Sequence, residues 1–512
     1  MKGSEIYKRV LWVLAALIAS IILVASVSKL GPARGVEKGA SIETFTAQMD
    51  ARIPALMEDY GIPGASIALV KDGGIVWTGA YGYADLEEGR EMTAGTYCRV
   101  QSISKPVTAW GVLKLVAQDK IELDASVGQY IKSWPFPESK YSTDKITVRQ
   151  LLSHYSGMPL GDVLTIYSPE EELPSLKESL TESAHPMQEP GVSFSYSNVG
   201  FNLLELLIEE VTGRDFSEYM EKEVLIPLGM NRSTFTWSEA LAPPVPLGYG
   251  LTGKTVPVYV YPEKASGGLF ASAEDVAAFV IAGMPDFAKE HPVLSPQDIN
   301  QLYMPEAQDL GVYSLVFDSY GLGYYIENLP DGKKAVSHGG QGTGIMTHFH
   351  AVPETGDGIV ILTNSQRSWP FISYIVSDWA RWCGFSTVGM GRIILGQYLL
   401  WAFIGLVWFV LLLQIWRLAE GIISGRRKPA LFSKKLRLLR LAQLSLFLIL
   451  AISLLWCVNQ DYLFLTSVFP VASGWLGISA CALAFVLLIS ALFPKDERKI
   501  KSFRRRSGVD YI

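Results

Sequence analysis

The chain has 512 residues, of which 49% are hydrophobic and 18% are charged, and its formal net charge is −6. This length exceeds one typical domain, and the positive mean hydropathy of +0.23 indicates a membrane contribution. The net negative charge argues against broad electrostatic binding to nucleic acid. The chain has only four cysteines, which does not suggest a disulfide framework.

Four apolar runs are long enough to cross a membrane. They lie at 10–27, 393–416, 441–458 and roughly 468–493. Lys and Arg residues precede the first run, occupy the loop 417–440 and fill the tail 494–512, whereas the link after the third run has none. The positive-inside rule therefore places both termini and the basic loop in the cytoplasm. We expect a multi-pass protein of the cell membrane with its large domain outside the cytoplasm.

The first run has a second interpretation. Residues 1–30 combine a basic start, an apolar stretch and the small residues Ser26 and Ser28, as a cleavable signal peptide does. The apolar stretch is long for a signal peptide, which favours an uncleaved anchor. The domain is exported under either interpretation.

The soluble domain, expected over 40–385, begins with a helix and two strands. Residues 44–60 have the apolar spacing of an amphipathic helix. The runs 65–70 and 74–83 are joined by Lys71-Asp72-Gly73, and an Asp-Gly pair between apolar runs favours a tight hairpin.

A helical middle and a second group of strands complete the domain. Its expected helices include 201–211, 216–224 and 371–382, and its expected strands are 334–337, 344–352 and 358–364. Strands at both ends with helices between them predict an α+β fold in which the terminal segments share one sheet.

Ser102-Ile103-Ser104-Lys105 places a hydroxyl and an amine three residues apart, just before the apolar-periodic run 107–116. On a helix these two side chains lie one turn apart on one face. A serine hydroxyl becomes a good nucleophile only when a base removes its proton, and a lysine is a base only when it is neutral. Alone, this spacing also occurs by chance on exposed helices.

Two later segments complete a constellation. Tyr196-Ser197-Asn198 lies in a loop ahead of a helix expected to begin near Gly200. Ser337-His338-Gly339-Gly340-Gln341-Gly342 directly follows a strand, where glycines let the backbone lie close to a substrate.

These segments resemble the serine β-lactamase and penicillin-binding protein family, particularly its class C-like members, DD-peptidases and esterases. Further matching segments are 151–159, 227–230 and 266–269, and the resemblance covers roughly 44–383. It implies a β-lactamase/transpeptidase-like fold, an antiparallel sheet flanked by helices with a helical subdomain. With the apolar runs, this gives one N-terminal and three C-terminal transmembrane helices.

The resemblance also implies roles for the catalytic residues. Ser102 would attack a carbonyl and become acylated. Lys105 and Tyr196 would act together as the general base. Lys105 would either keep Tyr196 ionised or take the Ser102 proton itself. The backbone N–H groups of Ser102 and Gln341 would bind the oxyanion, and Gly340 would belong to the same edge.

Two residues would complete substrate binding. Asn198 would bind the substrate amide, and His338 would stand where most members have lysine, as a partner of Tyr196. No equivalent of the class A deacylation glutamate is evident, which favours a class C type of mechanism. The histidine also weakens the case for a true β-lactamase.

The remaining histidines have structural interpretations. His154 is expected to bond a loop rather than to react. His348 and His350 share one strand face, but no third ligand has suitable spacing, so we predict a strand pair and no metal site. No cofactor is predicted.

The membrane part adds a partial resemblance to membrane-bound prodrug D-peptidases such as the colibactin-maturing enzyme, which remove N-acyl-D-amino-acid caps. Asn198 and Gly342 depart from that enzyme at positions that shape its pocket. The spans contain almost no ionisable residues, which argues against a transport path and favours anchoring.

The expected function is a membrane-anchored extracytoplasmic serine hydrolase. It would act through an acyl-enzyme on D-amino-acid-containing peptides or esters, either cell-wall peptides or N-acyl-D-amino-acid prodrugs. Expected partners are a small peptide, amide or ester substrate, the lipid membrane and cell-wall or natural-product biosynthesis proteins, without nucleic acid. Alternatives are a non-enzymatic acylation sensor, a cell-wall binding protein and a β-lactamase.

Overall fold

A computed structural model describes residues 2–28, 36–163, 165–288, 291–429, 438–460 and 463–494. The chain forms two units, one of residues 32–394 and one that combines residues 1–31 with 395–512. Each unit is described by itself.

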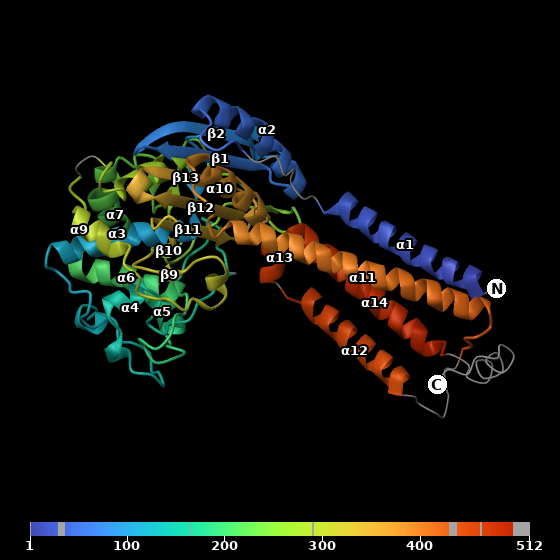
Figure 1. The fold of residues 1–512 in the computed structure, drawn as a ribbon. Coiled ribbons are helices and arrows are strands. Elements are labelled where there is room, and N and C mark those ends of the chain that lie inside the picture. Colours follow the sequence, from blue (N-terminus) through green and yellow to red (C-terminus); the bar gives the residue numbers. More distant parts are fainter. Residues whose placement is uncertain are drawn as a thin grey trace. The chain divides into compact units, whose positions relative to one another are not determined.

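The smaller unit is built from apolar helices (Figure 1). They are α1 (Lys2–Val27), α11 (Gly391–Ile423), α12 (Leu438–Val458), α13 (Phe464–Val468) and α14 (Pro470–Leu492). Within the described residues, four helices are long and apolar enough to cross a membrane, and their spanning segments are 10–27, 391–423, 438–458 and 470–492. The four predicted apolar runs are therefore confirmed as helices.

The larger unit is organised around an eight-stranded sheet with the order β3-β2-β1-β13-β12-β11-β10-β9. The strands are β1 (Gly64–Lys71), β2 (Gly74–Asp85), β3 (Arg90–Glu91), β9 (Ser319–Tyr320), β10 (Tyr325–Asn328), β11 (Lys334–Gly342), β12 (Ile345–Val352) and β13 (Asp357–Thr363). Every neighbouring pair is antiparallel, and β1 pairs with β13, with Ile67 opposite Ile361. The prediction that both ends of the domain share one sheet is therefore confirmed.

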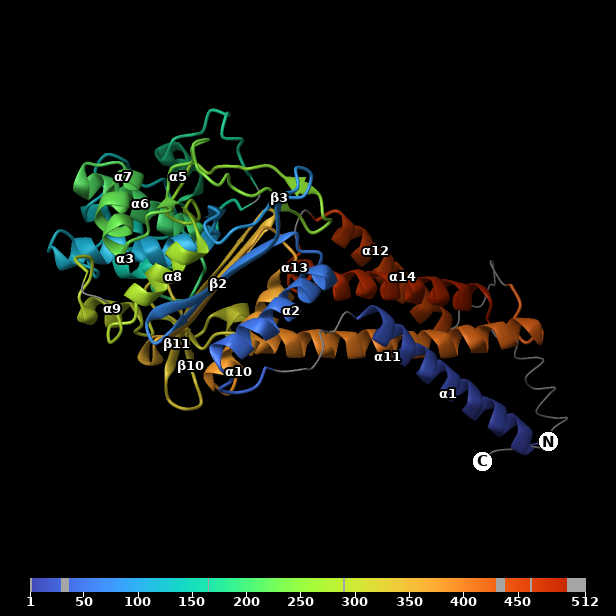
Figure 2. The same cartoon turned by 90° about the horizontal axis from the view of Figure 1, so that it is seen from above.

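Helices cover both faces of this sheet (Figure 2). On one side α2 (Ile42–Tyr60) packs with α10 (Trp369–Cys383), and α10 contacts β12 and β13. On the other side α8 (Ala273–Ala282) contacts β1, β2 and β13. The buried face of each amphipathic helix supplies the apolar surface that makes this three-layer packing stable.

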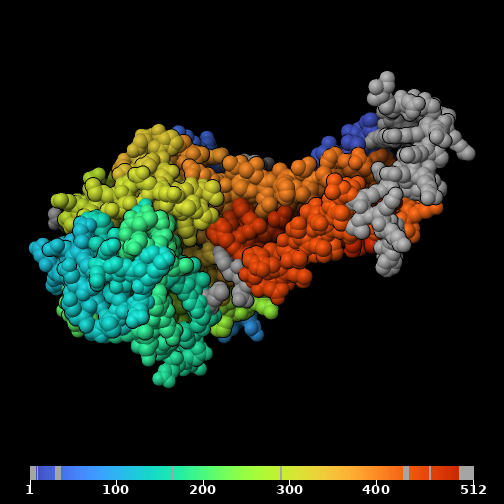
Figure 3. Space-filling view, turned by 90° about the horizontal axis from the view of Figure 1, so that it is seen from below, coloured from blue at the N-terminus to red at the C-terminus, as the bar shows by residue number. Residues whose placement is uncertain are grey.

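The helical subdomain lies beyond α8. It contains α3 (Ser104–Ala117), α4 (Val148–Leu152), α5 (Leu176–Ser183), α6 (Asn198–Thr212), α7 (Phe216–Met220) and α9 (Pro296–Leu302). Short strands accompany it: β4 (Cys98–Arg99), β5 (Ser233–Thr234) and β8 (Phe270–Ala271) form one small sheet, and β6 (Gly248–Tyr249) and β7 (Thr255–Val256) form another. In the space-filling view the cyan and green segments of this part of the chain form one continuous mass (Figure 3).

The helix α3 passes through the centre of the core. Val107, Trp110 and Leu113 have no exposed surface, and the Trp110 indole N–H donates to the Tyr324 hydroxyl at 2.9 Å. Burying a side chain of this kind contributes about 1.5–3 kcal/mol. The residues at the start of α3 are therefore held on a rigid element.

One predicted helix changes type, and one predicted boundary was wrong. The helix expected over 216–224 is helical throughout, as an α-helix to Met220 and as a π-helix over Glu221–Leu225. The strand expected to end at Ser337 continues to Gly342, because residues as far as Gly342 pair with β12. The His338–Gly342 segment is thus part of a strand rather than of a loop after it.

Candidate active site

Ser102 lies in a single 3₁₀ turn, η1 (Gln101–Ile103), that leads directly into α3. Its neighbour Gln101 has a φ of 54°, a left-handed conformation that is uncommon for a residue with a side chain. The turn is held from the sheet, because the Thr347 hydroxyl donates to the Val100 carbonyl at 2.7 Å. Strained backbone of this kind concentrates at functional sites, where the surrounding structure holds it.

Lys105 is completely buried one turn after Ser102. Its Nζ lies 3.1 Å from the Ser102 Oγ and also donates to Asn198 Oδ1 at 2.7 Å and to the Ser266 carbonyl at 2.8 Å. Burial lowers the pKa of Lys105 well below its usual value of 10.5, with no carboxylate contributing to the shift. A buried, neutral amine at hydrogen-bond distance from a hydroxyl is suited to removing its proton.

Tyr196 approaches the same hydroxyl from the loop before α6. Burial raises the pKa of Tyr196 above its usual value, and a hydrogen bond with the Ser102 side chain offsets part of that rise. The Tyr196 phenol is therefore protonated near neutral pH. Of the two arrangements that the family resemblance left open, these pKa directions favour Lys105 as the group that takes the proton.

His154 positions the Tyr196 loop. Its Nδ1 accepts from the Ser197 backbone N–H at 3.1 Å, its carbonyl accepts from the Ser195 N–H at 2.8 Å, and its ring lies 4.3 Å from that of Tyr196. His154 has no exposed surface, and burial lowers its pKa well below 6.5. It is a neutral positioning residue.

Glu205 organises the other side of the site and was missed by sequence reasoning. It is buried on α6, and its Oε2 accepts from the backbone N–H groups of Lys264 and Ala265 at 2.6 and 2.7 Å. Burial raises the pKa of Glu205 to about 8. These bonds fix the turn whose next residue, Ser266, presents its carbonyl to Lys105. The sequence did hold a signal for Glu205, because its carboxylate lies inside the otherwise apolar stretch Asn202–Ile208.

The strand β11, which carries Gly340 and Gln341, contacts the Ser102 turn η1. A Cβ at Gly340 would overlap the Val100 carbonyl oxygen, so only glycine permits this approach. Gln341 is oriented by the Trp369 indole N–H, which donates to its Oε1 at 3.0 Å. Contact between β11 and η1 gives the arrangement in which two backbone N–H groups can share an oxyanion.

His338 does not take the position expected from the sequence. It has no exposed surface, its Nε2 lies 3.2 Å from the Tyr320 hydroxyl, and its Nδ1 lies 2.9 Å from the Gly339 carbonyl. Its ring centre is 6.3 Å from that of Tyr196. Burial, together with Lys105, lowers the pKa of His338 to about 3, so it is a neutral group behind the site.

The two strand histidines lie together, on β12. His348 Nε2 is 3.5 Å from His350 Nδ1, and His350 Nε2 is 3.8 Å from a Glu327 carboxylate oxygen. Within the described residues, no group of three or more His, Cys, Asp or Glu side chains is placed to hold a metal ion.

A cavity of about 400 Å³ opens beside Ser102 and is called the Ser102 cavity below. Ser102, Asn198 and Gln341 line it, whereas Lys105, Tyr196 and His338 are not among its lining residues. Its outer wall comes from residues within 161–163, 165–167, 174–183 and the turn 261–267. The structure thus brings together Ser102, Lys105, Tyr196, Asn198 and Gln341 and leaves His338 one layer behind them.

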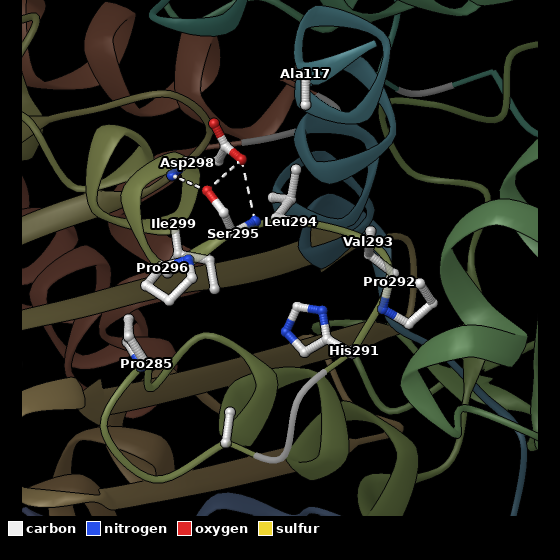
Figure 4. Close-up of a pocket in the computed structure, with 11 residues that line it drawn as sticks. Ala117, Pro285, His291, Pro292, Val293, Leu294, Ser295, Pro296, Asp298 and Ile299 are labelled. Atoms are coloured by element: carbon white, nitrogen blue, oxygen red, sulfur yellow. Dashed lines mark hydrogen bonds between the residues drawn. The ribbon is translucent and has the colours of Figure 1, made fainter.

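Another hollow, of about 750 Å³, shares no lining residue with the Ser102 cavity. Its polar groups are largely engaged in a helix cap, because Ser295 and Asp298 bond each other at the start of α9 (Figure 4). His291 also faces it, with its Nε2 3.4 Å from the Ala282 carbonyl. The polar part of its lining is thus mainly a helix cap.

The family model described as Beta-lactamase matches residues 49–373. The chain belongs to this family. Protein flp from Staphylococcus aureus strain NCTC 8325 is 25% identical over 473 residues, which cover 87% of this chain and 88% of that protein. Esterase EstB from Burkholderia gladioli is 26% identical over 290 residues, 48% of this chain and 72% of the esterase.

A solved structure supports the same assignment. The octameric penicillin-binding protein homologue from Pyrococcus abyssi is 28% identical, with a TM-score of 0.54, and the match covers 65% of this chain and 77% of that one. The expected β-lactamase/transpeptidase-like fold is therefore confirmed. The activity at family level is that of a serine hydrolase related to β-lactamases and penicillin-binding proteins.

Two glycines of the β-lactamase-family strand β11 provide a matched pair of variants. Gly340→Ala would place a methyl group on the Val100 backbone carbonyl, whereas the nearest atoms for Gly342→Ala belong to side chains, those of Gln101 and Tyr259. Overpacking against backbone costs about 1–3 kcal/mol. We expect Gly340→Ala to lower kcat/KM by at least about tenfold more than Gly342→Ala, as measured by ester hydrolysis. Equal activity of the two variants would contradict this close approach.

Proposed function

We propose that this protein is a membrane-anchored serine hydrolase that forms an acyl-enzyme at Ser102 on D-amino-acid-containing peptides or esters. The observation that carries the proposal is the buried Lys105 amine, 3.1 Å from the Ser102 Oγ. Its lowered pKa supports its role as the base. One relative, Esterase EstB, is named as an esterase, which supports esters in particular as substrates.

The reaction has two steps. The Ser102 Oγ forms a bond to the substrate carbonyl carbon while its proton passes to Lys105 Nζ, and the oxyanion is held by the N–H groups of Ser102 and Gln341. The bond to the leaving group then breaks, and the leaving group takes the proton, with the Tyr196 phenol placed to relay it. Water next attacks the acyl-enzyme, and the same groups move its proton to Ser102.

Asn198 and His338 have different parts in this proposal. Asn198 lines the Ser102 cavity and is held by Lys105, so its side-chain amide can meet a substrate amide. The buried, neutral His338 supplies no positive charge for a substrate carboxylate. We therefore expect weak hydrolysis of β-lactams compared with esters. Cell-wall peptides and N-acyl-D-amino-acid prodrugs are the substrate classes to compare, with cell-wall or natural-product biosynthesis proteins as partners.

The proposed location is the outer face of the cell membrane. It is supported by the four apolar helices together with the basic residues in the loop 417–440 and the tail 494–512. Both termini would then face the cytoplasm. The spans would act as an anchor for the hydrolase unit.

Two parallel experiments test the chemistry and the location. Full-length protein is incubated with esters, D-Ala-D-Ala peptides and N-acyl-D-amino-acid amides, and the acyl-enzyme on Ser102 is sought by intact mass. Intact cells are treated in parallel with a membrane-impermeant fluorophosphonate. We expect a mass increase on Ser102 and labelling of intact cells. Absence of any acyl-enzyme would overturn the chemistry, and labelling only after lysis would overturn the location.

A further inference from the structure

The Ser102 cavity is acidic. Four carboxylate side chains line it, namely Asp162, Glu178, Glu182 and Glu263. Among the described residues of this lining, none is Lys, Arg or His. Lys105 lies behind Ser102 and is not among the lining residues, and burial disfavours its charged form by lowering its pKa. A ligand in this space therefore meets a negative potential.

Glu263 is the most desolvated of these carboxylates. It sits in the turn 261–267, and its Oε1 accepts a hydrogen bond from the Ser179 hydroxyl on α5. The adjacent cation, Lys264, points to Asp215 instead, at 3.4 Å. Burial raises the pKa of Glu263, and the charge of Asp162 adds to the rise. A buried carboxylate of this kind is stabilised when a cation arrives.

Asn202 gives an independent sign of a ligand. It lines the same cavity from α6, one turn after Asn198, and only 5% of its surface is exposed. Its Oδ1 has no hydrogen-bond partner among the described residues. A buried amide oxygen without a partner destabilises the protein, and a bound N–H donor would relieve that cost. Asn202 Oδ1 is therefore a further hydrogen-bond acceptor in the cavity, in addition to the carboxylates.

We infer that the Ser102 cavity selects substrates that carry a protonated amine close to the acyl group. The inference rests on the proposed function and names the substrate class within it. The amine would donate to Glu263 and Asn202, with Glu182 adding negative charge at the mouth of the cavity. A substrate carboxylate in the same place would be repelled, because it carries the same charge as the carboxylates that line the cavity.

A factorial set of four esters of D-lysine tests this inference. The set comprises the ester with both amines free, the Nα-acetyl ester, the Nε-acetyl ester and the doubly acetylated ester, all with one leaving group. We expect kcat/KM at pH 7 to be about tenfold or more higher for at least one amine-bearing ester than for the doubly acetylated one. The preference should shrink at high salt, because screening weakens charge interactions. The singly acetylated esters identify which amine is bound.

Variants assign the preference to the cavity. Glu182→Gln/Glu263→Gln keeps side-chain shape but removes two charges, and it should reduce the ratio of kcat/KM for amine-bearing over doubly acetylated ester about tenfold. Glu172→Gln, an exposed residue outside the cavity lining, should leave the ratio unchanged. Thermal unfolding of each variant shows that it has folded.

The outcomes are distinct. Equal kcat/KM for all four esters, or an unchanged ratio in a folded Glu182→Gln/Glu263→Gln protein, overturns the inference and leaves the proposed hydrolase intact. If no ester acylates Ser102 at all, the proposed function itself fails.

Discussion

Ser102→Ala is expected to lower kcat/KM for an ester substrate by at least about 10⁴-fold, because it removes the atom that forms the acyl bond. The rest of the site should persist, since η1 and β11 are held by backbone contacts and by Thr347 rather than by the Ser102 hydroxyl. Steady-state hydrolysis measures the loss. Intact mass after fluorophosphonate treatment shows directly whether the hydroxyl at position 102 is the one modified.

Ser142→Ala provides a matched control. Ser142 is a partly buried serine outside the Ser102 cavity, and its side chain makes no capping bond at the 3₁₀ turn that follows it. The Ser142→Ala protein should be labelled by the fluorophosphonate, and should hydrolyse esters, to the same extent as the unaltered protein. Labelling of a folded Ser102→Ala protein to the same extent as Ser142→Ala would show that another residue is the nucleophile.

Lys105→Ala is expected to lower kcat/KM by about 10²–10⁴-fold, the usual contribution of a general base. Lys105→Arg should be equally impaired, because a guanidinium keeps its proton and cannot act as a base. A role for Lys105 as a simple positive charge predicts the opposite, namely partial rescue by arginine. The comparison of these two variants therefore separates proton transfer from electrostatic attraction.

The pH profile provides the second measurement on Lys105. The base must be deprotonated to act, so kcat/KM rises with pH through the pKa of Lys105 in the free enzyme. Because burial lowers that pKa, the rise should lie well below pH 10.5 and activity should fall only on the acid side of it. A rise centred near pH 10.5 would mean that Lys105 is charged and solvated.

The same shift couples Lys105 to stability. The folded protein disfavours the ammonium form, so the unfolded chain binds more protons over the range between the two pKa values. Lys105 therefore opposes folding as the pH falls through this range below 10.5. Keeping Lys105 buried and uncharged therefore lowers stability in this pH range, a trade-off between stability and activity that is common at active sites.

Much of the architecture was accessible from the sequence because it depends on local patterns. The Lys71–Gly73 turn and the alternation around it predicted the hairpin of β1 and β2, which the structure shows. The apolar runs predicted four long helices, since length and hydropathy alone decide whether a helix can span a bilayer. The three motif segments indicated the family that the match over residues 49–373 then showed.

Other features required the tertiary structure. The extent of β11 is set by its pairing with β12 rather than by its own glycine-rich sequence, which has weak strand propensity. The placement of His338 against Tyr320 follows from that pairing, because a strand fixes which side each residue faces. Likewise, no local pattern could place Glu263 and Ser102 in the lining of one cavity, since the fold brings these two segments together.

The sequence by itself therefore determined which groups are available: a serine one helical turn from a lysine, a tyrosine loop, a glycine-rich segment and four apolar helices. Tertiary structure decided their chemical state. Complete burial disfavours the charged form of Lys105 and leaves His338 neutral behind the site, because desolvation disfavours charge. The fold also gathers acidic side chains from distant segments into the Ser102 cavity, and the inferred preference for an amine-bearing substrate rests on this arrangement.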